Sequence, residues 1–217
     1  MGNEIGNPAS KLGITALSIT TPNIELKEFE KLLTNTRKVI TEKQSQPQTS
    51  PQLQANPDLI SREELQIQIL KPMDKFSPPD HELFNQLFIL FDETGYNLVD
   101  YKAFLSSAAV VLLSISLRDK LRFAFSIYDV EGNNALLRVD IKKMLLAINS
   151  ATAYFGDPVL DPKDIEAVTL QMSKDLPAKA KGHAIDEVIE YLLQNSTIQK
   201  FMRGDGTIRF GSPELRP

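Results

Sequence analysis

The chain has 217 residues, of which 42% are hydrophobic, so it is long enough to bury a sizeable core as one or two helical lobes. Its net charge of -4 gives no reason to expect a nucleic-acid partner. It has no cysteine, which excludes disulfides, zinc–thiolate sites and cysteine nucleophiles and is typical of an intracellular, cytoplasmic protein.

Residues 1–22 are predicted to form a flexible leader. The start, MGNEIG, resembles an N-myristoylation signal in which Gly2 is acylated after removal of Met1, although Gly6 stands where Ser or Thr is usual. The alternative is an unmodified polar leader. A single myristoyl chain binds membranes weakly and no Lys/Arg cluster lies nearby, so membrane association would need a second signal.

A first helix is predicted from Ile24 to Lys43, with Asn23 as its N-cap. Its apolar stripe consists of Leu26, Phe29, Leu33 and Ile40. Residues 44–59 are rich in Gln and Pro and are predicted to be a mobile loop. The segment ISREEL at 60–65 and the apolar run after it predict a second helix.

The stretch from Leu83 to Ile148 contains a repeated helix–loop–helix pattern. Each half has an apolar-faced helix that ends in an aromatic residue and an Asp, then a loop, then a second apolar-faced helix. Val99 and Leu136 occupy equivalent places in the two loops, where neighbouring loops could pair backbone to backbone. Ser116 is predicted to cap the helix between the halves.

These halves resemble EF-hands, and the resemblance is carried by FD and VDYKAF within 91–104 and by KLRFAFSIYDVEGN at 120–133. The longer chain is similar to the four-hand calcineurin B, neuronal calcium sensor and calaxin-like proteins. An EF-hand is a twelve-residue loop between two helices, and oxygens at positions 1, 3, 5, 7, 9 and 12 hold calcium.

The resemblance implies an all-α fold of two lobes, each a pair of EF-hands. The N-terminal lobe would cover residues 23–113 with the insertion at 44–59, and the C-terminal lobe residues 114–201. A helix predicted to start at Asp161 begins the fourth hand. A short helix at 195–201 would close the C-terminal lobe, and residues 202–217 would be a flexible tail.

Most of the calcium loops are predicted to be degenerate. Glu64 stands at position 12 of the first loop, but no acidic ligand precedes it at positions 1, 3 or 5. The loop that starts at Asp92 ends in Ala103, so we expect it to be metal-free. The fourth loop carries Lys179 and Lys181 where ligands belong and is about one residue too long.

The third loop keeps a partial ligand set. The candidate metal ligands, at positions 1, 3, 5 and 12, are Asp129, Glu131, Asn133 and Asp140. Asn134 can adopt the left-handed turn that glycine usually makes. An Asp at position 12 is shorter than Glu, which favours weak Ca²⁺ or Mg²⁺ binding. The alternative is that these side chains cap a helix or face solvent.

No catalytic constellation is found, so the chain is predicted not to be an enzyme. His81 and His183 lie far apart, and neither is accompanied by a metal-ligand or nucleophile pattern. No glycine-rich phosphate loop is present.

Binding remains as the expected activity. EF-hand lobes receive an amphipathic partner helix in an apolar groove, which calcium usually opens. The candidate groove residues are Phe84, Phe88, Phe125, Met144 and Leu145. The alternative is that they form only intramolecular core. We expect a largely calcium-independent adaptor or regulatory subunit that requires no cofactor. A weak Ca²⁺ or Mg²⁺ sensor and a structural component of an assembly such as a ciliary axoneme stay open.

Overall fold

A computed structural model describes residues 24–45, 51–113, 115–154, 159–177 and 182–202. These residues form an all-α fold built of helix–loop–helix units, with short strands only in the loops. The first unit contains α2 (Leu26–Gln44), α3 (Pro51–Ala55), β1 (Leu59–Ser61) and the π-helix η2 (Glu64–Leu70). The second contains α4 (Pro78–Phe91), β2 (Leu98–Asp100) and α5 (Tyr101–Leu112).

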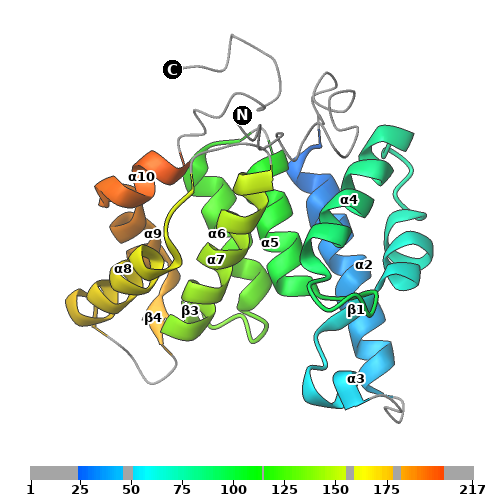
Figure 1. Cartoon of the computed structure of the whole chain (residues 1–217), viewed down its shortest axis with the longest axis horizontal. Helices are drawn as coiled ribbons and strands as arrows, with labels where there is room; N and C mark the ends of the chain where they lie inside the picture. Colours follow the sequence, from blue (N-terminus) through cyan, green and yellow to red (C-terminus); the bar gives the residue numbers. More distant parts are fainter. Residues whose placement is uncertain (1–23, 46–50, 114, 155–158, 178–181, 203–217) are drawn as a thin grey trace, which may run out of the picture.

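The third unit consists of α6 (Leu117–Tyr128), β3 (Ala135–Leu136) and α7 (Arg138–Tyr154). The fourth consists of α8 (Pro162–Asp175), β4 (His183–Ala184) and α9 (Ile185–Gln194), and α10 (Ser196–Met202) follows it. Figure 1 shows the first two units at one end of the molecule and the last two at the other. We call the four units hands 1 to 4.

Helix starts follow the local sequence. The hydroxyl of Ser116 accepts a hydrogen bond from the backbone N–H of Asp119, and the carboxylate of Asp161 accepts one from the backbone N–H of Lys163. Ser77 and Asp80 form a capping box at the start of α4, where two prolines also favour a helix start. The expected caps at Ser116 and Asp161 are therefore confirmed.

The first predicted helix is corrected at its start. It begins at Leu26 instead of Ile24, since Ile24 makes a parallel β-bridge with Leu113. Asn23, its expected cap, lies outside the described residues. The loop predicted at 44–59 is also corrected, because Gln44 belongs to α2, and α3 and the first residue of β1 lie within the predicted loop.

Val99 and Leu136 both pair backbone to backbone, but not with each other. Val99 of β2 pairs with Ile60 of β1, and Leu136 of β3 pairs with His183 of β4, both antiparallel. Hand 1 therefore pairs with hand 2, and hand 3 with hand 4, as in a two-lobe arrangement.

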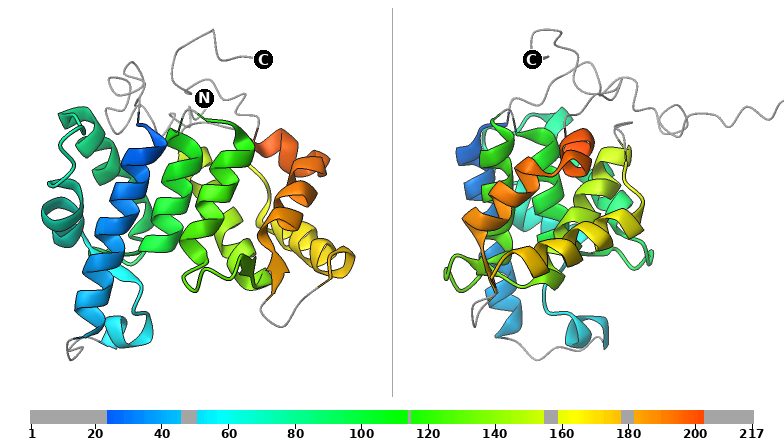
Figure 2. Two further views of the ribbon diagram at one scale, coloured as in Figure 1. Left: turned by 180° about the vertical axis from the view of Figure 1, so that it is seen from behind. Right: turned by 90° about the vertical axis from the view of Figure 1, so that its left-hand side faces the viewer.

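Two hydrophobic cores result, and they interlock across the expected lobe boundary at residue 113. Phe123 and Ile127 of α6 belong to the first core, whereas Val110 of α5 belongs to the second. Helices α2, α5 and α6 lie side by side in both Figures 1 and 2. The Arg37 guanidinium on α2 donates a 2.9 Å hydrogen bond to the Ser126 carbonyl on α6, which further joins the halves.

The first core is rich in aromatic rings. Phe84 stacks on Phe76 with ring centroids 5.5 Å apart, and its ring also contacts those of Phe29 and Phe104. In the second core, Ile198 of α10 is buried, as expected. Phe201 was expected to pack beside it, but its side chain is not among those that the structure describes. Figure 1 shows β1, β3 and β4 of the loops in the lower half of the molecule.

Candidate functional site

The loop of hand 3 is organised around the carboxylate of Asp129. One oxygen accepts a 3.0 Å hydrogen bond from the backbone N–H of Asn133, and the other accepts a 2.8 Å bond from that of Asn134. Asn134 has φ 55°, so the expected left-handed turn is confirmed. Gly132 also has a positive φ, of 67°. The loop backbone is thus folded by its own first side chain.

The side chains of Glu131 and Asn133 interact with each other and with the loop. The Asn133 amide donates a 3.0 Å hydrogen bond to the Glu131 carboxylate, and its oxygen accepts a 3.0 Å bond from the Ala135 N–H. Asp140 lies in the first turn of α7 and is half-buried. Each of the four candidate ligands therefore lies in or beside the third loop.

The donor set fits a metal only partly. Within the described part of the chain, no group of three or more His, Cys, Asp or Glu side chains lies close enough to hold a metal ion. Asp129, Glu131 and Asp140 are thus not gathered around one point. Carboxylate and amide oxygens are the ligands that Ca²⁺ and Mg²⁺ prefer, so binding would require these side chains to turn inward.

The loop of hand 2 has the same backbone but a poorer ligand set. Asp92 accepts a 2.9 Å hydrogen bond from the N–H of Asn97, which has φ 55°. Asp100 caps α5 by accepting bonds from the N–H groups of Lys102 and Ala103. Ala103 stands at position 12 and has no side-chain oxygen, so the loop lacks the carboxylate ligand of that position.

The strand pairing fixes the numbering of the fourth loop. His183 pairs with Leu136, which is at position 8 of the third loop, so Leu176 takes position 1. Leu176 directly follows α8 and has no oxygen side chain, and the acidic Asp175 lies one residue too early. This offset explains why the loop reads as one residue too long. Lys179 and Lys181 lie outside the described residues.

The candidate groove residues all lie in the cores. Phe84, Phe88, Phe125, Met144 and Leu145 are at most 1% exposed. Phe84 and Phe88 belong to the first core and the other three to the second. In this structure the chain's own helices cover all five, so a partner helix would reach them only after these helices separate.

Ion pairs tie the helices of the C-terminal half together. The Arg118 guanidinium contacts the Glu190 carboxylate, and that of Arg122 lies 2.5 Å from the Asp186 carboxylate. Both pairs join α6 to α9. Hydrogen bonding to Arg118 lowers the pKa of Glu190 below its usual value. These arginines are thus engaged within the molecule.

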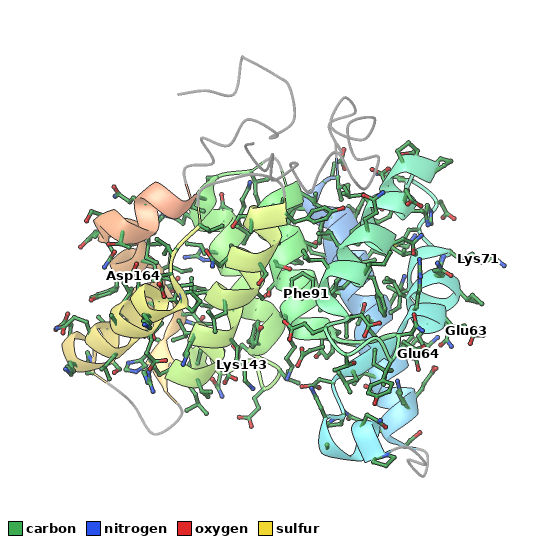
Figure 3. The ribbon with its side chains drawn as sticks, in the orientation of Figure 1. Glu63, Glu64, Lys71, Phe91, Lys143 and Asp164 are labelled. Atoms are coloured by element: carbon green, nitrogen blue, oxygen red, sulfur yellow. The ribbon has the colours of Figure 1, made fainter. Side chains whose placement is uncertain are left out.

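A second set of ion pairs joins α7 to α8, on which Figure 3 labels Lys143 and Asp164. Both Lys142 and Arg138 contact the carboxylate of Glu166. The pKa of Glu166 is lowered mainly by the hydrogen bond from Lys142 and then by that from Arg138. These ion pairs link hand 3 to hand 4.

The expected acylation site lies outside the described residues, since Gly2 is among residues 1–23. None of the helices in the described part of the chain combines the length and apolar character needed to cross a bilayer.

No family model matches the chain. Guanylyl cyclase-activating protein 1 of Lithobates pipiens is 27% identical over 143 residues, which are 62% of this chain and 69% of that protein. The protein of the same name from Gallus gallus is 27% identical over 143 residues, 62% of this chain and 71% of its own length. Calcium-binding protein K of Dictyostelium discoideum is 25% identical over 126 residues, 58% of this chain and 65% of that protein.

The names of these relatives describe an activator of another protein and a calcium-binding protein. Together with the paired helix–loop–helix units, these likenesses support a regulatory protein of the EF-hand superfamily.

Proposed function

Taking the chain as a regulatory EF-hand protein, we propose that it is a non-enzymatic adaptor or regulatory subunit that binds an amphipathic helix of a partner protein, largely independently of calcium. Within the superfamily, we propose a place near the four-hand calcineurin B, neuronal calcium sensor and calaxin-like proteins. The observation that carries the proposal is a contrast: both cores are complete, while only the Asp129 loop keeps a substantial set of ligands.

The contrast matters because calcium sensing needs ligands, whereas helix binding needs apolar helix faces. Phe84 and Phe88 on α4, together with Met144 and Leu145 on α7, supply such faces beneath the surface. A partner helix with apolar residues at i, i+3, i+4 and i+7 would bind where these helices part. The buried area gained there would offset the cost of separating them.

The test is a selection of helical peptides from a library with this apolar spacing, run once with chelator and once with calcium. Calorimetry then gives the dissociation constant of each selected peptide in both conditions. We expect the two values to agree within about twofold, which is less than 0.5 kcal/mol. The Asp129→Ala variant should bind the same peptide equally well. Selection of no peptide in either condition would contradict the adaptor function.

A second candidate is a weak Ca²⁺ or Mg²⁺ sensor, favoured by the left-handed Asn134 and the oxygen side chains of the third loop. A peptide affinity more than about tenfold higher in calcium than in chelator, and lost in Asp129→Ala, would select this sensor over the adaptor.

A further inference from the structure

The pairing of β1 with β2 fixes the numbering of the first loop. Val99 is at position 8 of the Asp92 loop, and its partner Ile60 is therefore at position 8 of the first loop. Leu59 then takes position 7, and Glu64 takes position 12. In a calcium loop these are the positions of a backbone carbonyl ligand and of a carboxylate ligand.

A positive charge of the chain itself lies between these two ligands. The ammonium nitrogen of Lys43, in the last turn of α2, is 3.0 Å from the carbonyl oxygen of Leu59 and 2.9 Å from a carboxylate oxygen of Glu64. The side chains of Lys43 and Glu64 are only 15% and 18% exposed. Figure 3 shows Glu64 at the start of η2, beside α2.

The remaining positions of this loop offer little to a divalent ion. Positions 1, 3 and 5 are Leu53, Ala55 and Pro57, none of which has a side-chain oxygen. Calcium requires six to eight oxygen ligands, whereas an ammonium group has only three N–H donors to satisfy. The retained oxygens therefore suit a lysine better than a metal.

We propose that hand 1 keeps a cation site whose resident cation is the ammonium group of Lys43. The lysine holds the start of β1 and the start of η2 together through the same two ligand positions that calcium joins in a metal-binding loop. Hand 1 is thereby held in one arrangement at every calcium concentration.

The carboxylate of Glu64 is positioned for this role by a second contact. It accepts a 2.6 Å hydrogen bond from the backbone N–H of Ser61, and the Ser61 hydroxyl accepts a 3.1 Å bond from the N–H of Glu64. This reciprocal pair is a capping box at the start of the helix. The capping box orients the Glu64 carboxylate, whose same oxygen also contacts Lys43.

A neighbouring lysine makes a similar link between the first two loops. The ammonium group of Lys102, at the start of α5, lies 2.6 Å from the carboxylate of Asp58, at position 6 of the first loop. Burial lowers the pKa of Lys102, but the hydrogen bond to Asp58 and the negative charges of Asp58 and its acidic neighbours together outweigh it, and the net pKa is raised. Lys43 thus joins the loop of hand 1 to its own helix α2, and Lys102 joins the same loop to α5 of hand 2.

The inference deepens the calcium-independent part of the proposed function without requiring any partner. Its test uses the full chain alone, so failure of peptide binding leaves it standing. Lys43→Met removes the charge and keeps an unbranched side chain. Lys38→Met is the matched control, because Lys38 is on the same helix but pairs with Glu42 at 4.0 Å on the exposed surface.

The measurement is amide hydrogen exchange by NMR. In Lys43→Met we expect the amides of Ile60 and Val99 to exchange at least about tenfold faster than in the parent, because the part-buried carboxylate of Glu64 loses its partner. Exchange at Leu136 and His183 should change much less. Equal exchange at Ile60 and Val99 in Lys43→Met and Lys38→Met would overturn the proposal.

A second variant pair covers the case in which Lys43→Met does not fold. Glu64→Gln should also speed exchange at Ile60, whereas Glu63→Gln, at the exposed neighbour, should not. If Lys43→Met does fold, the double variant of Lys43→Met and Glu64→Gln should lose less protection than the two single losses combined, because it leaves no unpaired charge. Additive losses would show that the two groups act separately and would overturn the proposal.

Discussion

The loops of hands 1 and 3 keep an acid at position 12 and pair with a neighbouring loop, yet their carboxylates have different partners. In hand 1 the carboxylate of Glu64 contacts the ammonium group of Lys43. In hand 3 the carboxylate of Asp129 is satisfied by backbone N–H groups, and that of Glu131 by the Asn133 amide. A metal could displace the contacts of hand 3 by side-chain rotation, whereas in hand 1 it would have to expel a tethered cation.

The comparison also shows that one loop fold survives different chemistry. Asn97 in the loop of hand 2 and Asn134 in the loop of hand 3 have the same φ of 55°. Only the loop of hand 3 has an acid at position 12. The loop backbone is therefore maintained by its first Asp and its left-handed Asn. The metal ligands are a separate requirement, which hand 3 meets better than hand 2.

The largest expected effect concerns the support of hand 3 by hand 4. Gly182 has φ 114°, and a Cβ there would lie 2.2 Å from the Leu136 carbonyl oxygen. Gly182→Ala should therefore lower the free energy of unfolding by about 2–4 kcal/mol, measured by urea denaturation. The control is Gly132→Ala, where nothing lies within 4 Å and the cost should be about 1–2 kcal/mol. Equal losses would contradict a close contact between β3 and β4.

The next effect tests whether Asp129 folds its loop. Asp129→Ala leaves the N–H groups of Asn133 and Asn134 without their acceptor and should lower the free energy of unfolding by about 1–3 kcal/mol. Asp92→Ala should cost a comparable amount, because Asp92 holds the N–H of Asn97. Urea denaturation of both variants without metal measures this. A negligible loss in both would mean that the turns form without the carboxylates.

A third prediction sharpens the difference between the two central loops. Asp140→Glu supplies the longer position-12 side chain that can bind calcium through both oxygens. It should raise the calcium affinity of hand 3 about tenfold, or about 1.4 kcal/mol, as measured by calorimetry. Ala103→Glu is the matched change in hand 2, where Thr94 and Tyr96 remain at positions 3 and 5. Calcium binding gained by Ala103→Glu alone would invert the proposed ranking of the loops.

The smallest effect appears only at high pH and reports on the junction of the two cores. Tyr128 packs against both cores, and burial, with a further contribution from the charge of Asp100, raises its pKa above the usual value. The neutral phenol is favoured in the fold, so its stabilising contribution is complete below the unfolded pKa of about 10 and is lost as pH rises towards the folded value.

Stability should therefore fall with pH above about 10, and Tyr128→Phe should reduce that slope. Urea denaturation across this pH range measures it. Tyr96→Phe is the control, because Tyr96 is 64% exposed. The same slope in Tyr128→Phe as in the parent would place the titrating group elsewhere.

The sequence predicts those parts of the fold that depend on neighbours along the chain. Ser116 and Asp161 are recognisable caps because their partners lie two or three residues away. The left-handed turn at Asn134 follows from the loop pattern for the same reason. The start of α2 was misplaced because Ile24 is held by Leu113, a contact that no local pattern reveals.

The features that the sequence does not reveal depend on distant contacts. Val99 and Leu136 occupy equivalent positions, so periodicity alone cannot say which strand each will pair with. The sequence predicts Lys43 only as the end of a helix. Its partner Glu64 is 21 residues away and belongs to another element, so no local pattern indicates the contact. The signal that could have identified the pair is a lysine in the helix before a loop that keeps only its position-12 acid.

The central claim is that hand 1 is independent of calcium and that only hand 3 can respond to it. The most direct test is a calcium titration of the isotopically labelled full chain, followed by amide NMR. We predict that any shifts are confined to the Asp129 loop and the β3–β4 pair and require calcium above about 10⁻⁴ M, while Ile60 and Val99 do not move. Shifts at Ile60 and Val99 that saturate at micromolar calcium would contradict the account.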